Sequence, residues 1–252
     1  MLDLIKLRLR HGKQAIPNIH TAEVLKTFRG FPIVDESKCE NNCEKCKSIC
    51  PTEAIEKNPL RIDLGKCIFC GECEKVCSGG AIKFTNNYRI GSTNREALII
   101  SSGKTFEQFE VEAIKAKKEI HKMFGRSLKL RQVSAGGCNG CELELNASTN
   151  VNFDMGRFGI DFVASPRHAD GIVITGPISS NMAPALKDAY QSVSDPKIVI
   201  AVGTCSISGG MFSSSNKINR NFFDEIPIDL FVSGCPPHPL TFIHALLDFL
   251  GK

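Results

Sequence analysis

The second half of the chain alternates short apolar runs with amphipathic stretches. Five runs are apolar and rich in β-branched residues, which predicts buried strands over residues 128–133, 160–164, 171–175, 197–204 and 229–234. Amphipathic stretches predict helices over residues 183–193 and 240–250, the last entered through three closely spaced prolines. Strands that are apolar throughout are typical of parallel sheets covered on both faces. Residues 128–252 are therefore predicted to form an α/β domain with a parallel sheet.

The N-terminal residues carry a weaker pattern and are predicted to be an arm, residues 1–38. Leu2, Ile5 and Leu9 are spaced as a helical stripe, although residues 5–10 also alternate as a strand would. The prolines and glycine that follow predict an extended path. This basic, amphipathic arm either rests on a membrane-associated partner or a lipid headgroup surface or docks on the chain's own body. The sequence leaves both open.

Residues 85–127 are predicted to link the two halves. Turn-rich sequence at 86–87 and 91–94 precedes a charged helix over residues 105–124, which Gly125 would end. The lysine cluster at 115–118 would face solvent. The buried side of this helix would be formed by Phe106, Phe109, Ala113, Ile114 and Ile120. We expect a linker helix that packs on a neighbouring element rather than a functional site.

Charge excludes one class of function. The chain has 252 residues and a net charge of +4, which is concentrated in residues 1–30, where six lysines and arginines face two acidic residues. No groove-reading motif or aromatic-rich basic patch accompanies this charge. Nucleic acid is therefore not a predicted partner.

Cysteine content indicates the chemistry. The first residues lack a signal-peptide pattern, and no apolar run approaches the roughly 20 residues that span a bilayer. A cytoplasmic, reducing location follows as an expectation. There, twelve cysteines indicate metal or redox chemistry rather than disulfides.

Eight of the cysteines form two copies of one pattern within residues 39–84. A shift of 27 residues superposes the last three cysteines of the first copy on the last three of the second. The pattern is that of bacterial two-cluster ferredoxins, in which the fourth cysteine of each copy binds the other cluster. One 4Fe–4S cluster is therefore assigned to Cys39, Cys43, Cys46 and Cys77. The other is assigned to Cys67, Cys70, Cys73 and Cys50.

Two features depart from the ferredoxin pattern. The first copy has one extra residue between its first two cysteines, which loosens this loop around Cys39, and Ser78 stands where a proline is usual. Zinc is the weaker alternative, because structural zinc sites pair distant Cys/His couples, whereas these quartets are close-packed and contain no histidine.

The remaining four cysteines follow predicted strands of the second half. Sites in open α/β sheets collect beyond the carboxyl ends of the strands, so three strand ends direct four thiolates to one rim. Four thiolates are the ligand set of a 4Fe–4S cluster, here Cys138, Cys141, Cys205 and Cys235. The glycine pairs at 136–137 and 209–210 suit backbone that lies close to a cofactor or partner.

Both halves of the chain resemble known families. Residues 28–30 and 64–74 resemble the polyferredoxin-type subunit of formate hydrogenlyase and other energy-converting hydrogenases, which is similar to the two-cluster subunit of complex I. The second half resembles the small subunit of those NiFe hydrogenases and the complex I subunit with the terminal cluster. Its matching motifs are residues 137–144, 154–159, 165–170, 175–177, 203–210 and 234–239. The resemblance implies that both subunits are fused in one chain.

The resemblance implies a fold and a function. The fold is an α+β two-cluster ferredoxin-like domain followed by an α/β flavodoxin-like domain. Cys138, Cys141, Cys205 and Cys235 would bind the proximal 4Fe–4S cluster, the third in the chain. The chain would be a non-catalytic electron-transfer subunit, relaying electrons between a ferredoxin or a formate dehydrogenase and the NiFe site of a separate large subunit. With other electron-transfer and membrane subunits it would lie on the cytoplasmic face of the membrane.

The resemblance leaves rival functions. Complex I relatives have adjacent cysteines where this chain has Cys138-x-x-Cys141, and this spacing favours a hydrogenase. A nickel-free complex I-like quinone or sulfane reductase subunit is the first alternative, and a free-standing ferredoxin-type carrier is the second.

Six further residues have open or minor assignments. Arg157, Arg167 and His168 are candidates for contacts around the cluster or at an interface, with ordinary surface ion pairs as the alternative. Glu144 is interpreted as a helix-capping residue and Glu142 as either that or a proton relay. His238, between prolines, is interpreted as a structural hydrogen-bonding residue.

Overall fold

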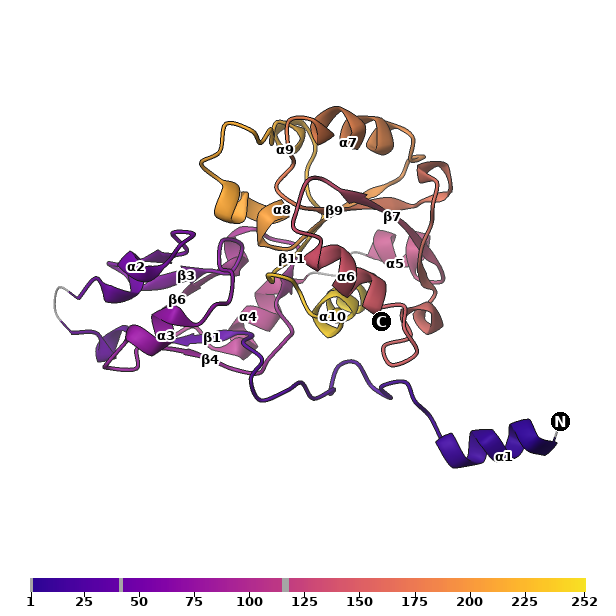
Figure 1. Ribbon diagram of the computed structural model, residues 1–252, viewed down its shortest axis with the longest axis horizontal. Helices are drawn as coiled ribbons and strands as arrows, with labels where there is room; N and C mark the ends of the chain where they lie inside the picture. Colours follow the sequence, from indigo (N-terminus) through magenta and orange to yellow (C-terminus); the bar gives the residue numbers. More distant parts are fainter. Residues whose placement is uncertain (1, 41–42, 115–117) are drawn as a thin grey trace.

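The computed structural model describes residues 2–40, 43–114 and 118–252. Within these residues the chain forms two units that lie side by side, a smaller one around α2 and α3 and a larger one around a six-stranded sheet (Figure 1). The N-terminal segment runs along the larger unit and begins with helix α1 (Leu2–His11), which projects from the body and buries none of its residues. The helical alternative for this stretch is thus correct, and the strand alternative is wrong.

The smaller unit repeats its backbone as well as its cysteines. Helix α2 (Lys45–Ile49) and helix α3 (Glu72–Val76) are related by the same 27-residue shift as the cysteines. The described strands form two antiparallel sheets, β1–β4 and β2–β3–β6. Their bounds are β1 (Pro32–Val34), β2 (Ile55–Glu56), β3 (Arg61–Asp63), β4 (Ile82–Phe84) and β6 (Ile99–Ser101).

The larger unit has five parallel strands and one antiparallel edge strand. The order is β5–β11–β10–β9–β7–β8, and the five parallel strands taken alone have the order of flavodoxin-like sheets. Their bounds are β7 (Leu128–Ser134), β8 (Ile160–Phe162), β9 (Gly171–Thr175), β10 (Ile198–Val202) and β11 (Leu230–Val232). All five coincide with predicted strands. The sheet is mixed rather than purely parallel, because β5 (Gly91–Ser92) pairs antiparallel with β11.

Register places the carboxyl ends of four strands at one level. Thr175 of β9 pairs with Ser134 of β7 and with Val202 of β10, and Val202 pairs in turn with Val232 of β11. The loops that leave these strands therefore start from one edge of the sheet, and they carry the last four cysteines.

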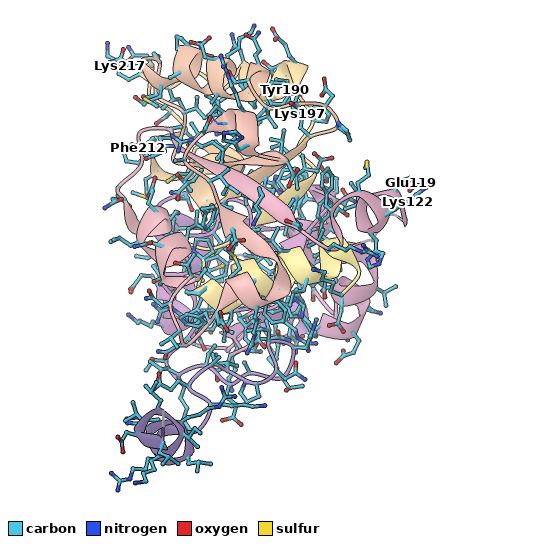
Figure 2. All side chains as sticks on the ribbon, turned by 90° about the vertical axis from the view of Figure 1, so that its right-hand side faces the viewer. Glu119, Lys122, Tyr190, Lys197, Phe212 and Lys217 are labelled. Carbon is cyan, nitrogen blue, oxygen red and sulfur yellow. The ribbon has the colours of Figure 1, made fainter. Side chains whose placement is uncertain are left out.

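Helices cover both faces of this sheet. Residues of β10 alternate, with Ile200 and Val202 in the core cluster of α10 and Val199 in the cluster of α7. Helix α10 (Pro239–Leu250) is buried along its whole length apart from Asp248. At the end of α7 (Met182–Gln191), the Lys197 ammonium lies 4.4 Å from the centroid of the Tyr190 ring (Figure 2). The other helices of the unit are α5 (Lys118–Phe124), α6 (Gly140–Ala147), α8 (Thr204–Ser208) and α9 (Phe222–Glu225), with 3-10 turns η3 (Met155–Phe158), η4 (Pro166–His168) and η5 (Gly210–Phe212).

The structure of residues 85–127 differs from the predicted linker in two respects. The single helix expected over residues 105–124 is two helices, α4 (Phe106–Ala113) and α5, because the chain is extended at Ile114. Of its predicted buried side, Phe109 and Ala113 are buried and the other three residues are half-buried. Residues 115–117 of the predicted lysine cluster lie outside the described residues.

The second difference concerns the strands that the linker supplies. Residues 91–94, expected to be a turn, include β5 at the edge of the large sheet, and residues 99–101 form β6 in the small unit. Gly91 makes this possible, because a Cβ at this position would clash with Ala245 of α10. Apolar residues of both units also share one core cluster, in which Phe231 and Ala201 of the sheet join Phe69 and Leu64.

Candidate metal centres

Four thiols of the small unit form a first group, here called group A: Cys39, Cys43, Cys46 and Cys77, which line one cavity. Burial raises the pKa of Cys46, and the nearby Cys39 and Cys77 thiols raise it further. Lys57 supplies a counter-charge, since its ammonium nitrogen lies 3.4 Å from Cys39 Sγ. The structure therefore brings together the four cysteines assigned to one cluster, including Cys39 beside the enlarged loop.

The other four thiols of the small unit form group B: Cys50, Cys67, Cys70 and Cys73. Burial raises the pKa of Cys73 to about 12, together with the neighbouring Cys50 and Cys70 thiols. Burial is also the main cause that raises the pKa of Cys67, followed by repulsion from the other three members of the group. Cys50 thus lies among the cysteines of the second copy, as the crossed ferredoxin pattern predicts.

In groups A and B, a backbone N–H group donates to the sulfur of the cysteine that comes from the other copy of the motif. Ala54 N–H donates to Cys50 Sγ at 3.3 Å, and Ala81 N–H donates to Cys77 Sγ at 3.2 Å. The two contacts are related by the 27-residue repeat. Hydrogen bonds of this kind stabilise negative charge on a thiolate sulfur and tune the potential of a bound cluster.

The last four cysteines form group C at the strand-end edge of the large sheet: Cys138, Cys141, Cys205 and Cys235. Burial raises the pKa of Cys205 to about 11, with repulsion from Cys235 and Cys138 adding to the shift. Burial likewise raises the pKa of Cys141, followed by Glu142 and the other three thiols. Cys138 and Cys235 are exposed, so one side of group C reaches the molecular surface.

The donor chemistry and the backbone around group C fit an iron–sulfur cluster. Crowded thiols that resist ionisation as free groups are held as thiolates when a metal ion supplies the compensating charge. Glycines line the group: a Cβ at Gly203 would lie 2.6 Å from Cys141 Sγ, and one at Gly210 would lie 3.1 Å from Cys205 Sγ. Glycine at these positions keeps the space beside the sulfurs free of side chains.

Arg220 lies against the Cys205 segment, a position that no sequence pattern predicted. Its guanidinium donates to the carbonyls of Cys205, Ser206 and Ile207 at 3.1, 2.8 and 2.9 Å. It thereby satisfies carbonyl groups at the end of helix α8, where cations are favourable. Burial lowers its pKa, while the Cys205 thiol opposes that shift.

Replacing Arg220 with glutamine is expected to lower the midpoint potential of a cluster bound by group C. Reduction adds negative charge, which the guanidinium stabilises. Losing about 1–2 kcal/mol of this interaction corresponds to a shift on the order of 40–90 mV for one electron. A redox titration followed by electron paramagnetic resonance measures it. Arg220→Lys is the control that keeps the charge, and an equal shift in both variants would contradict an effect of charge.

The three groups form a series in which A neighbours B and B neighbours C. Groups A and B are neighbours, because Cys46 of group A lies in one core cluster with Cys67 and Cys73 of group B, and its thiol adds to the raised pKa of Cys73. Groups B and C are neighbours, because Cys70 contributes in the same way to Cys235. A cavity between the two units is lined by Cys70 and Cys235 together with Arg29 and His238.

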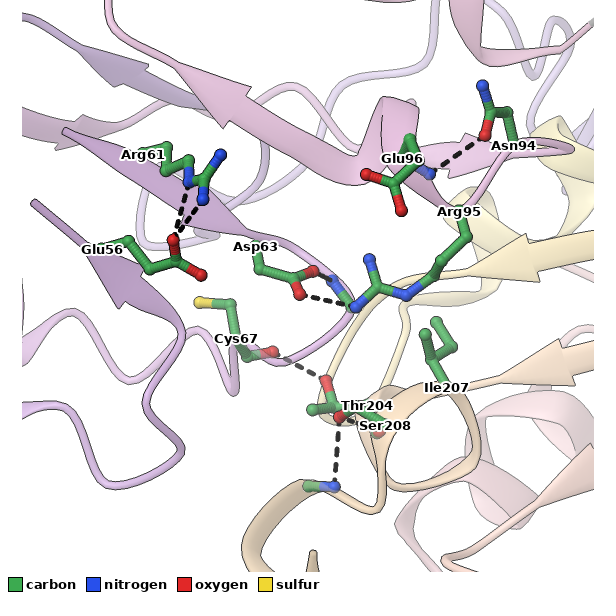
Figure 3. Close-up of polar contacts among 12 residues, drawn as sticks. Glu56, Arg61, Asp63, Cys67, Asn94, Arg95, Glu96, Thr204, Ile207 and Ser208 are labelled. Atoms are coloured by element: carbon green, nitrogen blue, oxygen red, sulfur yellow. Dashed lines mark hydrogen bonds and ion pairs between the residues drawn. The ribbon is translucent and has the colours of Figure 1, made fainter. Parts of the chain in front are cut away.

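A buried hydrogen bond joins the segments that carry groups B and C. The Thr204 hydroxyl donates to the Cys67 carbonyl at 2.7 Å, and Thr204 directly precedes Cys205 (Figure 3). Beside it, Arg95 and Asp63 form an ion pair at 2.5 Å. These contacts hold groups B and C at a fixed distance from each other. Thr204 is 1% exposed, so no layer of solvent separates the two segments at this residue.

Two glutamates of helix α6 differ in their surroundings. Glu142 lies in the first turn and accepts hydrogen bonds from Ser134 and Thr175, each at 2.6 Å. Burial opposes its charge, but these hydrogen bonds lower its pKa below the ordinary value. Glu144 lies beyond the first turn, and burial raises its pKa. The prediction that Glu144 caps helix α6 is therefore wrong, and Glu142 is the glutamate in the first turn of this helix.

The remaining predicted residues have structural or surface positions. His238 accepts from the Leu240 N–H at 3.2 Å and begins helix α10, in agreement with its predicted structural role. Arg157 donates to the Ile16 carbonyl and so holds the N-terminal segment. Arg167 and His168 are exposed on η4. An interface role for these last two stays a prediction.

Residues 138–249 match the family described as “NADH ubiquinone oxidoreductase, 20 Kd subunit”, and residues 31–78 match “4Fe-4S dicluster domain”. The chain is 40% identical over 134 residues to “Probable membrane-bound hydrogenase subunit mbhJ” of Pyrococcus furiosus, a match that covers 53% of this chain and 80% of that protein. The chain belongs to this 20 kDa subunit family. Its resemblance to NiFe hydrogenase and complex I subunits is thereby confirmed.

Two more members of the family show its range. Formate hydrogenlyase subunit 7 of Escherichia coli is 41% identical over 136 residues, covering 54% of this chain and 53% of that protein, so the chain spans about half of that relative's length. NADH-quinone oxidoreductase subunit 6 of Thermus thermophilus is 40% identical over 131 residues, covering 51% of this chain and 71% of that protein. These relatives are subunits of oxidoreductase complexes. None of the described helices is long and apolar enough to span a bilayer.

Proposed function

We propose that this chain is the electron-transfer small subunit of a membrane-bound, energy-converting NiFe hydrogenase and that it holds three 4Fe–4S clusters. The observation that supports this proposal most directly is the series of three thiol groups, in which A neighbours B in the small unit and B neighbours C across one cavity. Groups A, B and C would each bind one cluster through their four cysteines. The clusters, when bound, supply one-electron carriers.

The chain's own residues position the carriers and set the charge around them. The Thr204–Cys67 hydrogen bond fixes group B against group C. Lys57 and Arg220 place positive charge beside groups A and C. Backbone N–H groups at Ala54 and Ala81 stabilise the crossed sulfurs. The two cations and the two N–H groups favour additional negative charge at the thiolates and so favour electron acceptance.

The two end groups of this series indicate where partners would bind. The exposed side of group C, at Cys138 and Cys235, would face a large subunit that carries nickel. The chain's twelve cysteines are divided among the three groups, so nickel would be held elsewhere. Group A, at the other end, would exchange electrons with a ferredoxin or formate-oxidising partner. Other membrane subunits would hold the chain at the cytoplasmic face.

A nickel-free quinone or sulfane reductase is the alternative function. Overall similarity does not separate the two, because identity is 40% both to the hydrogenase subunit of Pyrococcus furiosus and to the NADH-quinone subunit of Thermus thermophilus. The two residues between Cys138 and Cys141 favour the hydrogenase, since complex I relatives have adjacent cysteines at this point.

Metal analysis of the intact complex tests the proposal. The tagged chain is purified anaerobically alone and with its partners, and iron, sulfide, nickel and zinc are measured in both samples. We expect about twelve iron per chain alone, with nickel only in the complex. Full iron without nickel in an intact complex would favour the reductase. Zinc in place of iron would overturn the cluster assignment.

A further inference from the structure

Part of the N-terminal segment docks on the large unit and reaches helix α10. Ile16 N–H donates to the Asn152 carbonyl at 2.8 Å, and Ile19 is 1% exposed within the core cluster of the large unit. The Tyr88 hydroxyl donates to the Ile19 carbonyl. This docking brings His20 against α10 at Asp248, the one residue of that helix that is not buried.

Three metal-ligating side chains meet there. His20 Nδ1 lies 3.8 Å from one carboxylate oxygen of Asp248, and His244 Nδ1 lies 3.3 Å from the other. His244 and Asp248 are four residues apart and therefore share one face of α10. The two imidazole rings lie with centroids 4.9 Å apart. Ligand atoms of all three residues lie within 4.8 Å of one another.

Arg89 and Glu110 are the charged groups that act on this cluster from neighbouring elements. Burial lowers the pKa of His244 to about 3, with His20 and Arg89 adding to the effect. Burial raises the pKa of Asp248 to about 6; His20 and Arg89 oppose this shift, and Glu110 adds to it. The Arg89 guanidinium is itself paired with Glu110 at 2.7 Å. Arg89 and Glu110 therefore compensate each other and leave the three side chains of the cluster as its metal-ligating groups.

We propose that His20, His244 and Asp248 bind a divalent transition-metal ion, zinc in the first instance, which fastens the N-terminal segment to helix α10. Two imidazoles and one carboxylate are a common zinc ligand set, with water in the fourth position. Zinc binds such sites more tightly than ferrous iron does. Donor atoms at about 2.0–2.1 Å from zinc lie about 3.3 Å apart. The His20 side chain, which is 39% exposed, would move the remaining distance.

Zinc loading of the full chain with its clusters in place tests this site. The anaerobic protein is incubated with zinc sulfate and desalted, and zinc and iron are then measured together with the zinc X-ray absorption edge. We expect about one zinc per chain, with only nitrogen and oxygen scatterers, at unchanged iron. His20→Gln and Asp248→Asn should each lower the bound zinc at least tenfold, whereas His168→Ala, an exposed histidine, should not change it.

Hydrogen exchange of the N-terminal segment gives a readout that requires no variant. Exchange at residues 14–22 should slow about tenfold when free zinc exceeds its dissociation constant tenfold, since only the docked state binds the ion. Sulfur scatterers at the zinc edge would overturn the proposal, as would zinc content that survives both substitutions at full iron. Unchanged exchange in zinc-loaded protein would overturn the fastening role.

Discussion

Replacing Cys50 and Cys70 together with alanine is expected to remove about four iron atoms per chain, whereas replacing Cys50 and Cys46 together should remove up to about eight. The reason is that Cys50 belongs to group B with Cys70, although the sequence places it in the same copy of the motif as Cys46. Two ligands lost from one cluster destroy that cluster alone. One ligand lost from each of two clusters damages both.

Iron and sulfide analysis of the two double variants, purified anaerobically, measures this difference. The matched control is Cys77 with Cys46, which lie in one group and should again cost about four iron atoms. Two substitutions within one group should cost no more iron than one of them alone, whereas substitutions in two groups should have additive effects on iron content. If Cys50 behaved as a partner of Cys46 and not of Cys70, the crossed assignment would be wrong.

Gly203→Ala is expected to abolish metal binding at group C and leave groups A and B loaded, so that iron falls from about twelve to about eight per chain. A Cβ at this position would lie 2.6 Å from Cys141 Sγ, well inside van der Waals contact. The backbone adds a second penalty, because Gly203 has φ +86° and ψ 154°, a region open essentially to glycine alone.

Gly103→Ala separates these two causes. Gly103 also has a positive φ, +80°, but a Cβ there would meet nothing within 4 Å. It should keep full iron content with only a small loss of stability, on the order of 1 kcal/mol. Iron analysis together with the resonance spectra of the reduced protein would compare the variants. A Gly203→Ala protein with full iron would show that group C is not packed around this glycine.

The strands and cysteine groups could be predicted from the sequence because their causes are local. Runs such as residues 198–202 are apolar at every position, which suits a strand buried on both faces. The repeat of 27 residues fixes both the helices and the crossing of Cys50 and Cys77. In these segments periodicity, spacing and tertiary structure agree.

Features decided by tertiary contact could not be predicted in this way. Arg220 reaches helix α8 from a stretch with no periodic pattern, and Lys57 reaches group A across the repeat. Ile114 interrupts a pattern that is helical on either side. His20 becomes a candidate ligand only because its segment docks on α10. Each depends on a neighbour distant in the chain, which one sequence does not reveal.

Strand β5 has a consequence for how this protein could be divided. The edge strand of the large sheet comes from residues 91–92, upstream of the unit that it completes. If the gene were split between residues 102 and 127, the first fragment would carry a short donor strand and the second an open acceptor edge at β11. The two polypeptides would then be expected to complement one another by strand addition. The resulting heterodimer would contain the complete six-stranded sheet that the single chain forms.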